Sequence, residues 1–171
     1  TLTSITDTVL NVTEVENNTN ISLDNSAITV TDAATLNDAT AINGFTEGQV
    51  TLNVVQDTVS NITSIDLIDS NEVSMAAAAV TVTDAASLAN ATAINGFTNA
   101  QVTLNSVQDS YSNLVSIIES SNTELDMSNA HVRVTDKVDF VKVNQLIANT
   151  SKLVTVDNIS DEKALLAVIN I

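Results

Sequence analysis

Residues 80–94, which read VTVTDAASLANATAI, decide the fold because closely related stretches occur twice more in the chain. The earlier copy, at 28–42, reads ITVTDAATLNDATAI, and a more divergent copy at 132–146 reads VRVTDKVDFVKVNQL. The copies begin 52 residues apart, since 80 − 28 and 132 − 80 are both 52. A regular period of this length is typical of repeat proteins, in which successive units stack on one another.

A shorter motif recurs inside this period. A β-branched residue, a polar residue and an Asp follow one another seven times, and the Asp residues are 25 or 27 positions apart. This spacing predicts a structural coil of about 26 residues, with two alternating kinds of coil making the 52-residue repeat. The seven aspartates are Asp7, Asp32, Asp57, Asp84, Asp109, Asp136 and Asp161.

The residues that follow each Asp have the spacing of a short helix. After Asp57, Val59, Ile62 and Ile65 recur every three positions, which places them on one helical face. An Asp just before a helix accepts hydrogen bonds from free N–H groups of the first turn and suits the helix dipole. We therefore expect all seven aspartates to be structural N-caps of the helices that follow them. The Asn-Gly pairs at 43–44 and 95–96 should end two helices, with Gly in the left-handed conformation.

The residues before each Asp alternate between apolar and polar, as strands do. Val80 and Val82 should point inward while Thr81 and Thr83 point outward, and a second short alternating pair, Val73 and Met75, precedes them. Each coil is therefore predicted to contain two short strands and one short Asp-capped helix. Because crossovers between parallel strands are almost always right-handed, the sequence predicts an α/β fold, a right-handed parallel solenoid.

The repeat boundaries predict one solenoid domain over residues 1–171. Its parts are a partial repeat at 1–27, full repeats at 28–79 and 80–131, and a divergent terminal repeat at 132–171.

The charge distribution excludes one class of partner. The formal net charge is −16, and residues 1–132 contain 16 acidic residues but no Lys or Arg. Nucleic-acid binding requires clustered cations that neutralise phosphates, so we expect no nucleic-acid partner. No apolar run approaches the roughly 18–20 residues of a membrane-spanning helix. A body without Lys or Arg also offers trypsin-like proteases no cleavage site, which favours an extracellular or cell-surface location.

The half-repeat VQDSYSNLVSI at 107–117, which is followed by a strand pattern and another V-T-D, carries a family resemblance. It is similar to the V-S-D-T-A-A-N-L repeats of very large secreted and cell-surface proteins of bacteria. The resemblance covers nearly the whole chain and implies a repetitive extracellular segment of an adhesin, surface-layer or filament-type protein. It implies no activity, and the G-G-x-G-x-D calcium motif of secreted toxins is absent.

Two acidic loops are the only candidates for a metal ion. Asp66, Asp69 and Glu72 lie in one loop, and Glu119, Glu124 and Asp126 lie in the loop 52 residues further on. Carboxylate oxygens suit Ca²⁺, although a solvated acidic edge explains the same residues. We therefore predict no cofactor and keep Ca²⁺ as an alternative.

The sequence offers little for catalysis. The only histidine, His131, has no Ser or Cys partner at a suggestive spacing, and the one tyrosine, Tyr111, falls at a helix core position. We therefore predict a structural, non-enzymatic segment that gives length and rigidity and that associates with itself or with neighbouring repeats. The alternative is an adhesin module that binds glycans or depends on calcium.

Overall fold

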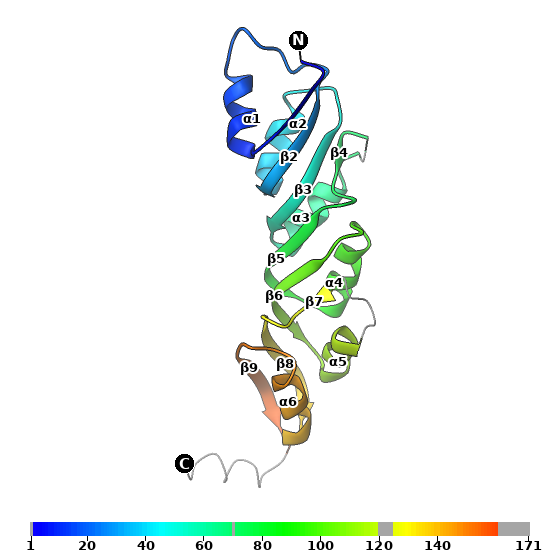
Figure 1. Cartoon of the computed structure of the whole chain (residues 1–171). Helices are drawn as coiled ribbons and strands as arrows, with labels where there is room; N and C mark the ends of the chain where they lie inside the picture. The colour runs from blue at the N-terminus through cyan, green and yellow to red at the C-terminus, as the bar shows by residue number, and fades with distance from the viewer. Residues whose placement is uncertain (1, 70, 120–124, 161–171) are drawn as a thin grey trace.

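The computed structural model describes residues 2–69, 71–119 and 125–160. Within these residues the chain forms one nine-stranded sheet in which paired strands are parallel, and α-helices alternate with the main strands. Figure 1 shows an elongated molecule with the strands stacked along its length and the helices lying beside the sheet. The sheet curls like half a barrel. The fold is therefore α/β and solenoid-like.

The elements follow a simple order along the chain. The main strands are hydrogen-bonded in the order β1-β2-β3-β5-β6-β8-β9, and the short strands β4 and β7 pair with β3 and β6. The bounds are β1 Ser4–Asp7, α1 Val9–Glu16, β2 Ala27–Ala34, α2 Leu36–Asn43, β3 Val50–Asp57, α3 Val59–Asp66, β4 Val73–Ser74, β5 Ala79–Ala86, α4 Leu88–Asn95, β6 Val102–Asp109, α5 Tyr111–Glu119, β7 Leu125–Asp126, β8 His131–Val138, α6 Phe140–Ile147 and β9 Val154–Ile159.

The strand register advances unevenly. Val80 pairs with Val102, 22 residues later (102 − 80), and Ser106 pairs with His131, 25 residues later (131 − 106). A single coil length of about 26 residues stays a prediction, because the two kinds of interface have different offsets.

The prediction of two short strands in every coil is wrong for alternate coils. The strands β3 and β6 each run without interruption through both predicted segments. In the coil between them, β4 and β5 are separate, because Met75–Ala78 forms a turn in which the Ala78 N–H donates to the Met75 carbonyl at 2.9 Å. Leu52 is followed by the next buried position at Val55, so this coil has no residues to spare for such a turn.

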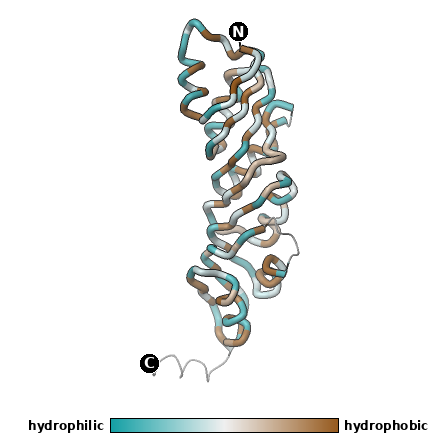
Figure 2. The backbone as a smooth tube through the Cα atoms, in the orientation of Figure 1, coloured by the Kyte–Doolittle hydropathy of each residue, from teal (hydrophilic) through white to brown (hydrophobic). Residues whose placement is uncertain are grey.

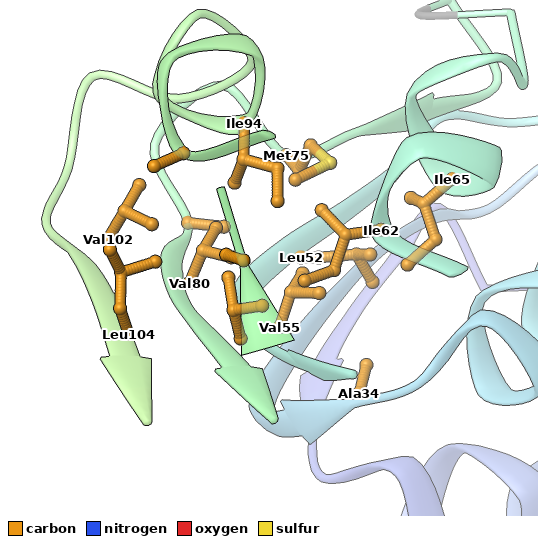
Figure 3. Close-up of a cluster of buried hydrophobic side chains, with 14 of the residues drawn as sticks. Ala34, Leu52, Val55, Ile62, Ile65, Met75, Val80, Ile94, Val102 and Leu104 are labelled. Carbon is orange, nitrogen blue, oxygen red and sulfur yellow. The ribbon is translucent and has the colours of Figure 1, made fainter. Parts of the chain in front are cut away.

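The core lies between the sheet and the helices. Apolar and polar residues alternate along the strands (Figure 2), and Val80 and Val82 are buried while Thr81 and Thr83 face outward, as the pattern predicts. In Figure 3, Leu52 and Val55 from β3 meet Ile62 and Ile65 from α3. Each fully buried Ile or Leu contributes about 1.5–3 kcal/mol, and the described core contains no aromatic side chain that is fully buried.

The predicted left-handed glycine caps are wrong. Gly44 has φ −69° and ψ −12°, and Gly96 has φ −71° and ψ −15°, so both remain in the right-handed region. A Cβ built on either glycine would lie 3.2 Å from a carbonyl oxygen of the helix that it ends. The glycines therefore relieve crowding at the last turn rather than supply a left-handed conformation.

Candidate functional site

The N-cap positions of the helices are not held by the predicted aspartates. Thr8, Thr35, Thr58 and Ser87 hold four of them, and each side-chain oxygen accepts from a backbone N–H three residues later. Asp139 caps α6 in the same way. The assignment of the recurrent aspartates to these positions is therefore corrected, because a hydroxyl residue or Asp139 comes between each of them and its helix. Asp161 lies outside the described residues.

The first group of aspartates ends the strands β1, β3 and β6. The Asp57 carboxylate accepts from the Thr58 N–H at 2.8 Å and from the side chain of Asn61 at 2.8 Å. Its other oxygen accepts at 2.9 Å from the N–H of Leu36, the first residue of α2 in the preceding coil. The equivalent contacts are Asp109 with Ser110, Asn113 and Leu88, and Asp7 with Thr8 and Asn11.

The second group sits where the register shifts. Asp32, Asp84 and Asp136 lie in the irregular stretches of β2, β5 and β8, and such bulges redirect a side chain. The Asp84 carboxylate accepts at 2.8 Å from the N–H of Val59, the first residue of α3 in the preceding coil. Asp32 contacts the Val9 N–H at 2.8 Å and Asp136 the Tyr111 N–H at 2.7 Å in the same manner.

Together, the aspartates form what we call the inter-coil carboxylate ladder, defined as Asp32, Asp57, Asp84, Asp109 and Asp136. Each member accepts from the first N–H of the helix in the preceding coil, from α1 through α5. Negative charge at a helix N-terminus is favoured by the free N–H groups and the helix dipole. The ladder therefore ties every coil to the one before it, in addition to the strand pairing.

The pKa of Asp109 reflects this environment. Partial burial raises it, but the hydrogen bonds from Leu88, Asn113 and Ser110 together outweigh burial and hold the pKa below the ordinary value of an aspartate. The pKa of Asp7 is also lowered, by its hydrogen bonds from Asn11 and Thr8. Both carboxylates are therefore in the charged form that accepts these bonds at neutral pH.

A second set of ties was not predicted from the sequence. The hydroxyls of Thr46, Thr98 and Thr150 donate to the backbone carbonyls of Ser26, Ala78 and Ala130, at 2.7, 2.7 and 2.5 Å. The three threonines are 52 residues apart, so their recurrence was the available signal. The Asn residues four positions after Asp7, Asp57 and Asp109 were missed for the same reason, although D-[ST]-x-x-N recurs visibly.

The acidic loops do not form a metal site in the described part of the chain. No group of three or more His, Asp or Glu residues there is placed to hold a metal ion. Asp69 instead accepts from the backbone and side chain of Asn71, and Glu72 accepts from the side chain of Asn43 at 3.2 Å. In the second loop, Asp126 accepts from the Ser128 N–H, and Glu124 lies outside the described residues.

One acidic residue of the first loop is unfavourably placed. Asp66 is the last residue of α3, where the helix dipole disfavours negative charge, and desolvation raises its pKa. The folded protein therefore prefers the protonated form, so ionisation of Asp66 lowers stability as the pH rises above the ordinary aspartate pKa. We expect Asp66→Asn to raise the free energy of unfolding by about 0.3–0.5 kcal/mol at neutral pH, because the site is largely exposed.

Denaturant titration followed by far-ultraviolet circular dichroism measures this gain. The matched control is Glu14→Gln, which removes the same charge from the exposed surface of α1. A gain that persists well below the ordinary aspartate pKa, or an equal gain in the control, would contradict the explanation.

The outer face of the sheet changes character near the C-terminal end. Arg133 on β8 forms a two-point ion pair with Asp157, with N–O distances of 3.0 and 3.1 Å, and also donates to Gln108 on β6. His131 lies beside Ser106 on the neighbouring strand, and no hydrogen bond joins these two side chains among the described residues. These side chains line a hollow of about 160 Å³, smaller than the roughly 300–1,000 Å³ of typical small-molecule sites.

Tyr111 connects two helices rather than filling the core. It is half-buried, its hydroxyl donates to Gln145 on α6, and the Lys142 ammonium lies 5.1 Å from the centre of its ring. The predicted core position is therefore corrected to a helix–helix contact on the outer side of the solenoid.

Comparisons with known proteins place no further constraint on the site. Across the described residues, no helix has both the length and the hydrophobicity needed to cross a membrane. No protein-family model matches the sequence, and neither a curated protein nor a solved structure is significantly similar to it.

Proposed function

We propose that this chain is a structural, non-enzymatic repeat segment of an extracellular or cell-surface protein that supplies length and rigidity. The inter-coil carboxylate ladder carries the proposal, because it fastens each helix from α1 to α5 to the following coil. Repeat proteins are held by nearest-neighbour contacts, so a tie at every junction resists bending along the whole rod. A coil of about 26 residues, repeated in pairs, would extend such a rod indefinitely.

The surface supports an exposed, load-bearing role. The formal net charge of −16 keeps the protein soluble, and the absence of Lys and Arg from residues 1–132 removes the cleavage sites of trypsin-like proteases. The similarity of the V-T-D half-repeats to those of large bacterial surface proteins supports the same location. Association with neighbouring repeats or copies through open strand edges fits this role.

Rigidity is measured directly by spin labelling, because the chain contains no cysteine. Leu10→Cys on α1 and Val141→Cys on α6 introduce two labels on residues that are 65% and 78% exposed, near opposite ends of the described chain. We expect a narrow distance distribution between the labels that is insensitive to salt. A single-label sample of each variant shows whether contacts between molecules contribute.

Two results would contradict the proposal. A broad distance distribution would show that the coils bend relative to one another. A sedimentation coefficient typical of a compact sphere, in place of an elongated particle, would show that the chain adds no length.

A further inference from the structure

The edge formed by α6 and β9 exposes positions that are buried in the earlier repeats. Ile159 is 41% exposed, whereas Val55 and Val107, at the equivalent positions of β3 and β6, are 0% exposed. Val154 and Val156 are half-buried, whereas Val102 and Leu104 are buried. Something that covers Val55 and Val107 is therefore missing from this edge among the described residues.

In the earlier repeats, the covering element is a helix that follows the strand. Leu114 and Ile117 of α5 are 0% and 2% exposed, and they belong to the same apolar core as Val107. The sequence at 161–171 has the same pattern 52 positions further on, with Leu166 in place of Leu114 and Ile169 in place of Ile117.

The carboxylate ladder supplies an independent second argument. Leu36 and Leu88, the first residues of α2 and α4, donate to an Asp that lies 21 positions later in the sequence (57 − 36 and 109 − 88). Phe140 is the first residue of α6, the next helix of the same kind, and position 161, again 21 residues later, is also an Asp. The rule that holds for α2 and α4 therefore designates Asp161 as the acceptor for the Phe140 N–H.

We propose that residues 161–171 dock on the edge formed by α6 and β9. The Asp161 carboxylate accepts from the Phe140 N–H, and Leu166 and Ile169 lie against Ile159. The occupant of this edge is thus a segment of the same chain. The inference rests on the repeat geometry and does not depend on the proposed structural function.

Amide hydrogen exchange of the full chain, followed by nuclear magnetic resonance, tests the docking. Asp161→Asn should speed exchange of the Phe140 amide by roughly five- to tenfold, the change that the loss of one capping hydrogen bond produces. Leu166→Asp should speed exchange of the Phe140 and Ile159 amides by at least the same factor, because a charge cannot be buried against Ile159.

Val168→Asp is the matched control, because position 168 corresponds to the exposed Ser116 of α5. It introduces the same charge into the same segment and should leave both amides unchanged. The proposal is overturned if none of the variants changes the exchange, or if Val168→Asp acts as strongly as Leu166→Asp. It is also overturned if protection of these amides rises with protein concentration, since a second copy would then cover the edge.

Discussion

Replacing Val107 with Asp is expected to lower the free energy of unfolding by about 4 kcal/mol or more. Val107 on β6 is 0% exposed and pairs in the sheet with Val132 on β8. The described residues around it offer only aliphatic side chains of the core, so a carboxylate placed there would have no partner. With a typical domain stability of 5–15 kcal/mol, a loss of this size removes a large part of the total.

Far-ultraviolet circular dichroism with denaturant measures the loss, and limited proteolysis locates it. Thermolysin is suitable, because trypsin has no site before Arg133. The control is Gln101→Asp, which adds the same charge at an exposed position directly before β6 and should change stability by less than about 0.5 kcal/mol. If both variants were equally destabilised, the inward and outward assignment of these residues would be wrong.

The apolar pattern predicts the fold well because burial is a local periodic property. The spacing of Ile62 and Ile65 places both on the buried face of α3, and the alternation at Val80 and Val82 places both in the core. The parallel stacking follows from repetition, since identical coils bury their faces most simply against one another. These features require only the sequence of one repeat and its period.

The position of the aspartates could not be predicted in the same way. An Asp shortly before a helix indicates a cap of that helix, yet the Asp84 carboxylate accepts from Val59, in the coil before its own. That contact depends on the bulge after Val82, which no residue pattern marks. The correct residue type was predicted and the wrong helix, because a contact between coils depends on the register of the strands.

Replacing Asp57 with Ala is expected to cost about 2–3 kcal/mol, the second largest effect. The carboxylate accepts three hydrogen bonds, from the Thr58 N–H, the Asn61 side chain and the Leu36 N–H. Bonds to a charged group are worth about 1.5–3 kcal/mol each, but the site is only partly buried, so the sum is reduced. Thr58→Ala removes only the N-cap bond of α3 and should cost about 1 kcal/mol.

The pH dependence distinguishes the ladder from general charge repulsion. At the equivalent Asp109, the folded-state pKa is lowered, so its contribution is complete above the ordinary aspartate pKa and is lost as the pH falls through the folded value. Wild-type stability should therefore fall steeply in acid, whereas Asp109→Asn should show a shallower fall. Repulsion within a chain of net charge −16 would have the opposite sign, because protonation would relieve it.

Amide exchange in Asp57→Ala identifies which helix the carboxylate serves. If Asp57 capped only α3, the affected amides would lie at the start of α3, beginning with Val59. The ladder instead predicts faster exchange at Leu36 on α2, 21 residues earlier (57 − 36), because that N–H loses its acceptor. Asp84→Ala is the matched comparison and should release the Val59 amide, whose acceptor lies 25 residues later (84 − 59). Unchanged exchange at Leu36 in the first variant, with faster exchange at Val59, would reduce the ladder to ordinary local capping and remove the main support for a rigid rod.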